Sequence, residues 1–232
     1  MTQKYTILFD LDGTLVDTAP DLMLAHNHVM KKFGYPTRSA EDIRILAGKG
    51  ASAMIGRSLW EQAKEEFGKV NDQAIKEEMV KEFIDFYGKN IINKSTLILG
   101  VKEFLEWCKK KDISMAVCTN KQEHLAIDLL KKIKIYDYFE FVAGSNTFDY
   151  HKPDPRHLTS IVEILNGDLN KCLMIGDSET DANAAQAASI PVILLENGYT
   201  EKNTDEIYHN HLITDFIGVE KIVSTYLKDW FN

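Results

Sequence analysis

The chain has 232 residues, of which 44% are hydrophobic and 27% charged, with 35 acidic against 27 basic side chains. This length exceeds that of a mini-domain and suits one large domain, or a core with a smaller insert. With only 13 glycines and five prolines, disordered and fibrous classes are excluded. The acidic balance without a basic stripe argues against nucleic-acid partners, and no apolar run approaches the ~18 residues of a membrane span.

The N-terminal residues and the cysteines both predict a cytoplasmic protein. Met1–Lys4 lead directly into a strand-like run, without the long apolar segment of a secretory signal. Cys108, Cys118 and Cys172 form no CxxC pair, and each lies in an apolar segment. We therefore expect buried, reduced thiols and no membrane partner.

Five short apolar runs predict strands that are buried on both faces. These runs are Tyr5–Phe9, Ile113–Cys118, Phe139–Ala143, Cys172–Ile175 and Pro191–Leu195. The last four are separated by helical patterns over Glu123–Ile133, Pro155–Leu165 and Glu179–Ala188. Strands that alternate with helices predict right-handed βαβ units. We therefore expect an α/β fold with a doubly wound, Rossmann-like parallel sheet.

Residues 17–92 interrupt this alternation with amphipathic helices and no convincing strand. Capping residues and apolar spacing predict four helices: one from Thr18-Ala19-Pro20-Asp21 to Gly34, one beginning at Ser39, one over Ala51–Trp60, and one with an apolar face from Ile75 to Tyr87. We predict that residues 17–92 form a helical cap. The α/β core would then consist of residues 1–16 and 93–232.

The segment that follows the first predicted strand carries the strongest chemical signal. Asp10 and Asp12 lie two residues apart at the tip of a buried strand, so their carboxylates point the same way if the backbone stays extended. Like charges so placed are costly unless a cation or a proton offsets them. Gly13 permits a tight turn and can expose a backbone N–H group to an anion. A solvated Asp-Gly turn would explain Asp12 and Gly13 but not Asp10.

Polar residues also follow three later strands, at the edge where α/β sheets bind ligands. They are Thr119-Asn120, Lys152-Pro153 and Gly176-Asp177-Ser178-Glu179-Thr180-Asp181. Each has an ordinary structural explanation when taken alone: a helix cap, a solvent-facing lysine, and acids in the first turn of a helix. Their order along the chain is more specific than any one of them.

Together these segments resemble the four motifs of the haloacid dehalogenase superfamily of phosphotransferases. The resemblance covers nearly the whole chain, and the helical insert is similar to the C1-type cap of that family. Within the family, the stretches Asp10–Leu22 and Gly48–Ala51 are similar to phosphoglycolate phosphatases. Leu99 and Gln122 depart from this pattern, because these relatives usually carry proline at both positions.

The resemblance implies a mechanism through an aspartyl-phosphate. Asp10 would attack phosphorus, and Asp12 would serve as general acid and then as general base. Mg²⁺ would be held by Asp10, the backbone carbonyl of Asp12, and Asp177. Asp181 would orient metal-bound water or Lys152 rather than bind the metal directly.

The remaining expected contacts concern the substrate. The phosphoryl group would be bound at the residues Asp12, Gly13 (through its N–H), Thr119, Asn120 and Lys152. In the cap, Gly48, Lys49 and Gly50 stand at a helix entry and are candidates for contacting a small carboxylate. The implied partner is a small phosphorylated metabolite, with 2-phosphoglycolate favoured, and the protein would be a monomer or a homodimer.

Other functions share parts of this pattern. A phosphomutase similar to β-phosphoglucomutase, or another sugar-phosphate or nucleotide phosphatase of this family, would show the same motifs. A signalling receiver domain also uses Asp, Thr, Lys and Mg²⁺, but Asp12 and an insert of about 75 residues in a chain far longer than such a module argue against it. A degenerate binding protein is disfavoured because no motif position is lost.

Overall fold

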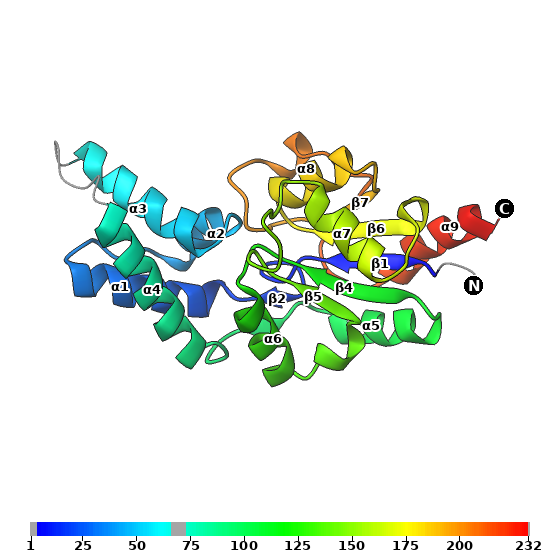
Figure 1. The fold of residues 1–232 in the computed structure, drawn as a ribbon, viewed down its shortest axis with the longest axis horizontal. Coiled ribbons are helices and arrows are strands. Elements are labelled where there is room, and N and C mark those ends of the chain that lie inside the picture. Colours follow the sequence, from blue (N-terminus) through cyan, green and yellow to red (C-terminus); the bar gives the residue numbers. More distant parts are fainter. Residues whose placement is uncertain (1–3, 66–72, 232) are drawn as a thin grey trace.

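A six-stranded parallel sheet organises the larger part of the molecule in the computed structural model, which describes residues 4–65 and 73–231 (Figure 1). In spatial order the strands are β5 (Phe141–Ala143), β4 (Ser114–Cys118), β1 (Thr6–Phe9), β6 (Cys172–Gly176), β7 (Val192–Leu195) and β8 (His211–Ile213). The predicted α/β fold is therefore confirmed. Strand β8 was not predicted, because its three residues include a histidine and form no continuous apolar run.

Helices cover both faces of this sheet, which explains why its strands are apolar throughout. Ile7 and Phe9 of β1 pack on one face with the helices α5 (Val101–Lys110), α6 (Glu123–Lys132) and α9 (Val219–Phe231). Leu8 points to the other face, toward α7 (Arg156–Ile164) and α8 (Glu179–Ala187). All three cysteines are buried and free, as predicted.

The predicted helical insert lies beyond the carboxyl ends of the strands (Figure 1). Its helices are α1 (Ala19–Phe33), α2 (Ala40–Ala47), α3 (Ala51–Glu65) and α4 (Gln73–Lys89). Gly34 ends α1 with a φ of 79°, and Ser39 forms the capping box of α2 with Asp42. The predicted capping role of the Thr18 side chain is wrong, because its hydroxyl accepts no hydrogen bond from the first turn of α1 and donates to Asp12.

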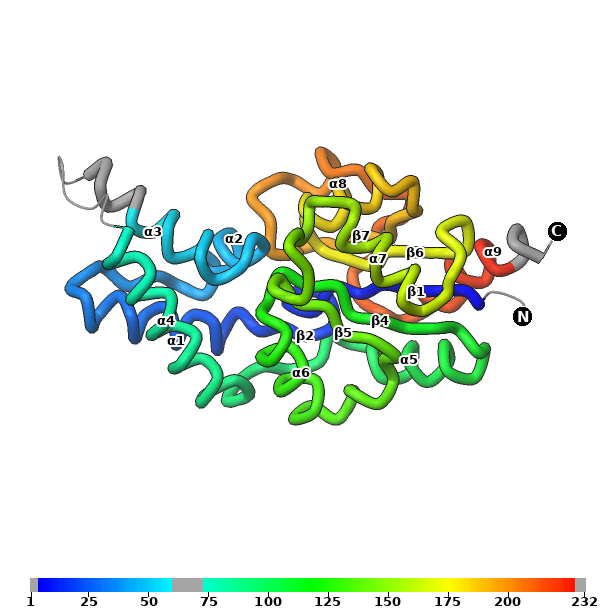
Figure 2. The backbone as a smooth tube through the Cα atoms, in the orientation of Figure 1, coloured from blue at the N-terminus to red at the C-terminus, as the bar shows by residue number. Residues whose placement is uncertain are grey.

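The two connections between the insert and the sheet run side by side (Figure 2). Here β2 (Val16–Asp17) and β3 (Thr96–Leu97) form an antiparallel pair, with Val16 opposite Leu97. The sequence did not predict this pair, because two residues per strand carry no periodicity. Among the described helices, none combines the length and the apolar character needed to cross a membrane.

Candidate active site

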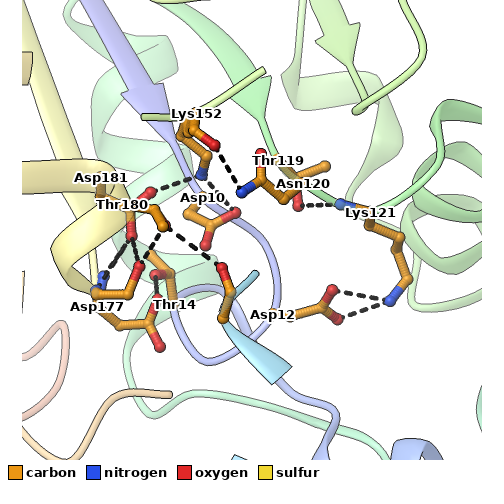
Figure 3. A network of polar contacts seen from close by, with 12 residues as sticks. Asp10, Asp12, Thr14, Thr119, Asn120, Lys121, Lys152, Asp177, Thr180 and Asp181 are labelled. Carbon is orange, nitrogen blue, oxygen red and sulfur yellow. Dashed lines mark hydrogen bonds and ion pairs between the residues drawn. The ribbon is translucent and has the colours of Figure 1, made fainter. Parts of the chain in front are cut away.

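The carboxyl ends of the central strands bring three of the predicted segments together (Figure 3). Strand β1 pairs directly with β4 and with β6, so that Asp10, Thr119 and Asp177 follow three adjacent strands. The Asp10 N–H donates to the Ile175 carbonyl at 2.9 Å, which extends the β1–β6 ladder up to Asp10 itself. A cavity of about 300 Å³ opens at this edge, lined by Asp10 and Thr119 and by residues of the insert.

Three buried carboxylates form a cluster at this edge. Asp10, Asp177 and Asp181 can each present an oxygen within 4.8 Å of the others. Asp177 is held by two donors: the Thr14 hydroxyl at 3.1 Å from Oδ1 and the Tyr199 N–H at 2.6 Å from Oδ2. The convergence of distant carboxylates that the sequence predicted is therefore present in the structure.

Gly13 makes room for this cluster. Its φ is +83°, and a Cβ atom at this position would lie 2.1 Å from Asp177 Oδ2, so that no other residue fits. The predicted phosphate contact of Gly13 is not available in this conformation, because its N–H donates to the Val16 carbonyl at 2.8 Å. The tight turn that Gly13 permits thus uses the donor that was expected to face an anion.

Lys152 lies fully buried between two of the carboxylates. Its Nζ atom is 2.5 Å from Asp181 Oδ1 and 2.9 Å from Asp10 Oδ1. Burial alone would favour the neutral amine, but Asp10 and Asp181 raise the pKa of Lys152 above its usual value. Asp181 is also an acid in the first turn of a helix, the ordinary structural role expected for it, because it closes the capping box of α8 with Ser178. Asp181 therefore serves the helix and the lysine together.

The cluster carries more negative charge than its surroundings neutralise. Burial first, and then Asp181, raise the pKa of Asp10 to about 6 against the opposing effect of Lys152. Burial and the other two carboxylates also raise the pKa of Asp177 well above its usual range. Asp10 Oδ1, although close to Lys152, accepts no hydrogen bond of good geometry among the described residues. These carboxylates can bind a metal cation, which would offset their mutual repulsion.

Asp12 belongs to a second network. The chain turns after Asp10, because the N–H groups of Leu15 and Val16 donate to the Leu11 carbonyl. The backbone therefore does not continue in the extended form that would point both carboxylates the same way. The Asp12 carboxylate instead accepts hydrogen bonds from Lys121 Nζ, at 2.8 Å from each oxygen (Figure 3). It also accepts a hydrogen bond from the Thr18 hydroxyl at 2.7 Å.

Thr119 and Asn120 line the cavity beside Asp10. The buried Thr119 hydroxyl accepts a hydrogen bond from the Lys121 N–H at 3.2 Å, which leaves its proton available to a ligand. The Asn120 amide donates to the Lys152 carbonyl at 3.0 Å, linking the two predicted segments. Both predicted residues are thus placed at the cavity.

The cap segment Gly48-Lys49-Gly50 reaches the core at the same cavity. The Thr180 hydroxyl donates to the Gly48 carbonyl at 3.4 Å. Lys49 Nζ lies 3.3 Å from Glu179 Oε1, and the lysine side chain is 46% exposed. The segment lies where the sequence predicted, but the Lys49 ammonium is directed to a carboxylate of the protein itself.

Tyr199, which sequence reasoning missed, connects the cap with the acid cluster. Its hydroxyl donates to Asp17 at 2.6 Å and accepts from the Ala19 N–H at 2.7 Å, and Arg44 donates to the same Asp17 carboxylate at 2.7 Å. Its backbone N–H holds Asp177. The only sequence signal was its place after the strand β7, at the same edge of the sheet.

Lys121 and Tyr87 were also missed, although both line the cavity. Lys121 directly follows Thr119-Asn120, but a single lysine in a loop is usually exposed. Tyr87 was assigned only to the apolar face of a cap helix. The contact between them joins α4 to the loop before α6, and no spacing in the sequence indicates it.

Comparison with known proteins places this geometry in a family. Residues 7–195 match the haloacid dehalogenase-like hydrolase family. A phosphoglycolate phosphatase of Mesorhizobium japonicum is 37% identical over 210 residues, or 90% of each chain. One of Caulobacter vibrioides is 37% identical over 222 residues, covering 96% of this chain and 92% of its own. The crystal structure of a predicted phosphoglycolate phosphatase from Haemophilus somnus superimposes with a TM-score of 0.89 at 29% identity, covering 96% of this chain and 99% of that one.

Proposed function

The chain belongs to the haloacid dehalogenase-like hydrolase family, and we propose that it hydrolyses 2-phosphoglycolate to glycolate and phosphate through an aspartyl-phosphate. The observation that carries this proposal is the position of Asp10. It stands at the carboxyl end of β1 on the cavity wall, with Lys152 at 2.9 Å and two further carboxylates beside it. The phosphoglycolate phosphatases named above support the choice of substrate.

Asp10 acts as the nucleophile in this proposal. Its carboxylate attacks phosphorus, the bond to the ester oxygen breaks, and water later hydrolyses the acyl phosphate to return the carboxylate and release phosphate. Because a phosphate dianion repels a carboxylate, neutralising charge and aligning the reactants must supply most of the rate. Lys152 provides one positive charge directly at Asp10.

The buried acid cluster fits a magnesium ion. Three buried carboxylates that repel one another, one of them with an oxygen that accepts no hydrogen bond, form the hard oxygen environment that Mg²⁺ prefers. Asp10, Asp177 and the backbone carbonyl of Asp12 would hold it, and Asp181 would keep Lys152 in place. When bound, the ion supplies positive charge that stabilises the phosphoryl group during transfer.

Asp12 acts as the general acid and then the general base. It lines the same cavity as Asp10 and is the second carboxylate of the motif. It must carry a proton when the ester reacts, because it gives this proton to the leaving alkoxide oxygen and later takes one back from the attacking water. In the structure its carboxylate is occupied by Lys121 and Thr18, so it must exchange these partners before it can act.

The remaining cavity residues hold the substrate. Thr119 and Asn120 donate to the phosphoryl oxygens from the loop after β4. The cap segment from Gly48 to Gly50 closes the other side and excludes water from the reacting group. Two hydrogen bonds in the structure support closure of the cap over the cavity: Thr180 donates to the Gly48 carbonyl, and Arg44 donates to Asp17.

A panel of phosphate esters, ranked by kcat/KM in the presence of Mg²⁺, tests the proposal. We expect 2-phosphoglycolate to rank above hexose phosphates and nucleoside monophosphates, with one phosphate released per ester consumed. EDTA should abolish turnover and added Mg²⁺ should restore it. A hexose phosphate that is isomerised without release of inorganic phosphate would instead identify a phosphomutase.

A further inference from the structure

The proposed reaction leaves two buried groups of the cavity without a role. Lys121 has a side chain only 4% exposed, and its ammonium contacts both oxygens of Asp12 at 2.8 Å. The same ammonium lies 4.4 Å from the centroid of the Tyr87 ring. The Tyr87 hydroxyl is buried and has no hydrogen-bond partner in the described part of the chain. A buried donor without a partner is costly, and it points to a ligand that accepts from it.

Positive charge that could meet a second anion of the substrate is scarce at the cavity. The carboxylates of Asp10, Asp12, Asp177 and Asp181 outnumber the ammonium groups of Lys121 and Lys152 by two. Lys152 is fixed between two carboxylates, whereas Lys121 is paired with Asp12 alone among the carboxylates of the described residues. Its long, flexible stem allows the ammonium to change partner without movement of the backbone.

We propose, on the basis of the proposed phosphatase function, that Lys121 and Tyr87 bind the carboxylate of the substrate, and that Lys121 exchanges Asp12 for this carboxylate when the substrate enters. The ammonium and the phenolic hydroxyl together supply two donors to one carboxylate. The exchange frees Asp12 to face the leaving oxygen. Binding of the substrate carboxylate and release of Asp12 from Lys121 then occur in the same step.

Lys49 is a poorer candidate for this contact. Its side chain is 46% exposed, and its ammonium already lies against Glu179, outside the paired network of Asp12. Lys121 instead stands on the core two residues after Thr119, so its distance from the phosphoryl site does not depend on the cap. Tyr87 comes from α4, and it covers the lysine from the cap side.

Kinetics of three variants test the proposal with two substrates. Ethyl phosphate has the length of 2-phosphoglycolate but lacks its carboxylate. We expect Lys121→Met to lower kcat/KM for 2-phosphoglycolate about 10- to 100-fold but not for ethyl phosphate, because the substitution also frees Asp12. Tyr87→Phe should lower the first value about 3- to 10-fold and leave the second nearly unchanged. Lys121→Arg should recover part of the preference.

The matched control is Lys131→Met, which also removes a lysine that lies over a tyrosine ring, 4.9 Å from the centroid of Tyr136 and away from the cavity. We expect no change with either substrate. Equal losses on both substrates in Lys121→Met would overturn the proposal, because Lys121 would then act only through Asp12. An unchanged preference would overturn it as well. Tyr87→Phe preserves the ring and guards against a folding artefact.

Binding measurements separate this inference from the proposed function. In 3-phosphonopropionate a methylene replaces the ester oxygen, so it binds without turnover, and propylphosphonate lacks its carboxylate. By calorimetry with Mg²⁺ present, we expect the first to bind more tightly to the unsubstituted protein and the difference to vanish in Lys121→Met. A difference that persists in the variant overturns the inference. Failure of the unsubstituted protein to release phosphate from 2-phosphoglycolate overturns the proposed function instead.

Discussion

The two buried lysines of the active site lie in different environments. Lys152 is enclosed with Asp10 and Asp181 at the ends of the core strands, and its side chain has no exposed surface. Lys121 lies at the boundary of core and cap, paired with an Asp12 side chain that is 17% exposed and covered by Tyr87. The first network is built by the core alone, whereas the second needs both parts of the molecule.

This difference separates a fixed charge from an exchangeable one. A cation between two buried carboxylates cannot leave without leaving unpaired charge behind, so Lys152 is suited to holding Asp10, the proposed nucleophile, in place. A cation with one partner at a cavity wall can transfer to a ligand. We therefore expect the ion pairs of Lys152 at the strand ends to persist and that of Lys121 at the boundary with the cap to exchange.

The largest expected effect comes from Asp10, the proposed nucleophile, in the core network. Asp10→Asn should lower kcat about 10⁴-fold or more, because an amide cannot form the acyl phosphate. Phosphate release from 2-phosphoglycolate measures the loss. The melting temperature without metal should stay the same or rise, since one of three repelling carboxylates is removed. Residual activity above about one per cent would contradict a nucleophilic Asp10.

Substitution of each lysine by methionine should then distinguish the two networks in stability. Lys152→Met should lower the free energy of unfolding by about 3–5 kcal/mol, because it leaves two buried carboxylates without their cation. Lys121→Met should lower it by about 1–2 kcal/mol, since Asp12 keeps the Thr18 hydroxyl and reaches water. Urea denaturation measures both. Equal losses would remove the distinction between a fixed and an exchangeable charge.

Magnesium should stabilise the protein more at pH 7.5 than at pH 5. The folded, metal-free protein holds a proton on Asp10 with a pKa of about 6, against 3.8 for the ordinary carboxyl group, so this group destabilises the fold as pH rises from 4 through 6. Mg²⁺ competes with that proton. At a single Mg²⁺ concentration, 100 times the Kd at pH 7.5, we expect a rise in melting temperature of about 5–10 °C at pH 7.5 and a smaller one at pH 5, where the Kd is higher.

Asp177→Asn serves as the control for this pH dependence. Without that carboxylate, the stabilisation by Mg²⁺ should nearly disappear at both pH values. An equal rise in melting temperature at pH 5 and pH 7.5 in the unsubstituted protein would show that the ion binds somewhere other than this cluster.

The smallest effect is expected at the edge of the cap. Lys49→Met should change kcat/KM for 2-phosphoglycolate by less than about threefold, because this exposed ammonium is paired with Glu179 and screened by water. Steady-state kinetics at low and high salt would measure it. A loss as large as that of Lys121→Met would assign the substrate carboxylate to the cap segment instead of to the core.

Much of the fold could be predicted because it depends on patterns that are local in sequence. Apolar runs such as Tyr5–Phe9 require burial on both faces, and their alternation with helices allows little besides a parallel sheet. The pair of β2 and β3 could not be predicted, since its strands are two residues long and lie far apart in the chain. Strand β8 was missed for a similar reason.

The acid cluster could be anticipated because each of its members follows a strand of the same sheet. Topology then brings Asp10 and Asp177 to one edge whatever their side chains do. The partners of Asp12 could not be anticipated, because the turn at Leu11 redirects it and a lysine stem of four carbons can reach in many directions. The use of the Gly13 N–H by Val16 was likewise a consequence of that turn.

By itself the sequence determined which chemical groups stand at the strand ends, because strand burial and chain order leave one arrangement. Tertiary structure alone decided which acid each lysine pairs with: Lys152 lies between two carboxylates, Lys121 pairs with Asp12, and Lys49 pairs with Glu179. Pairing among long side chains depends on distances of a few ångströms between segments remote in sequence. Such distances are fixed only when the cap and the core pack together.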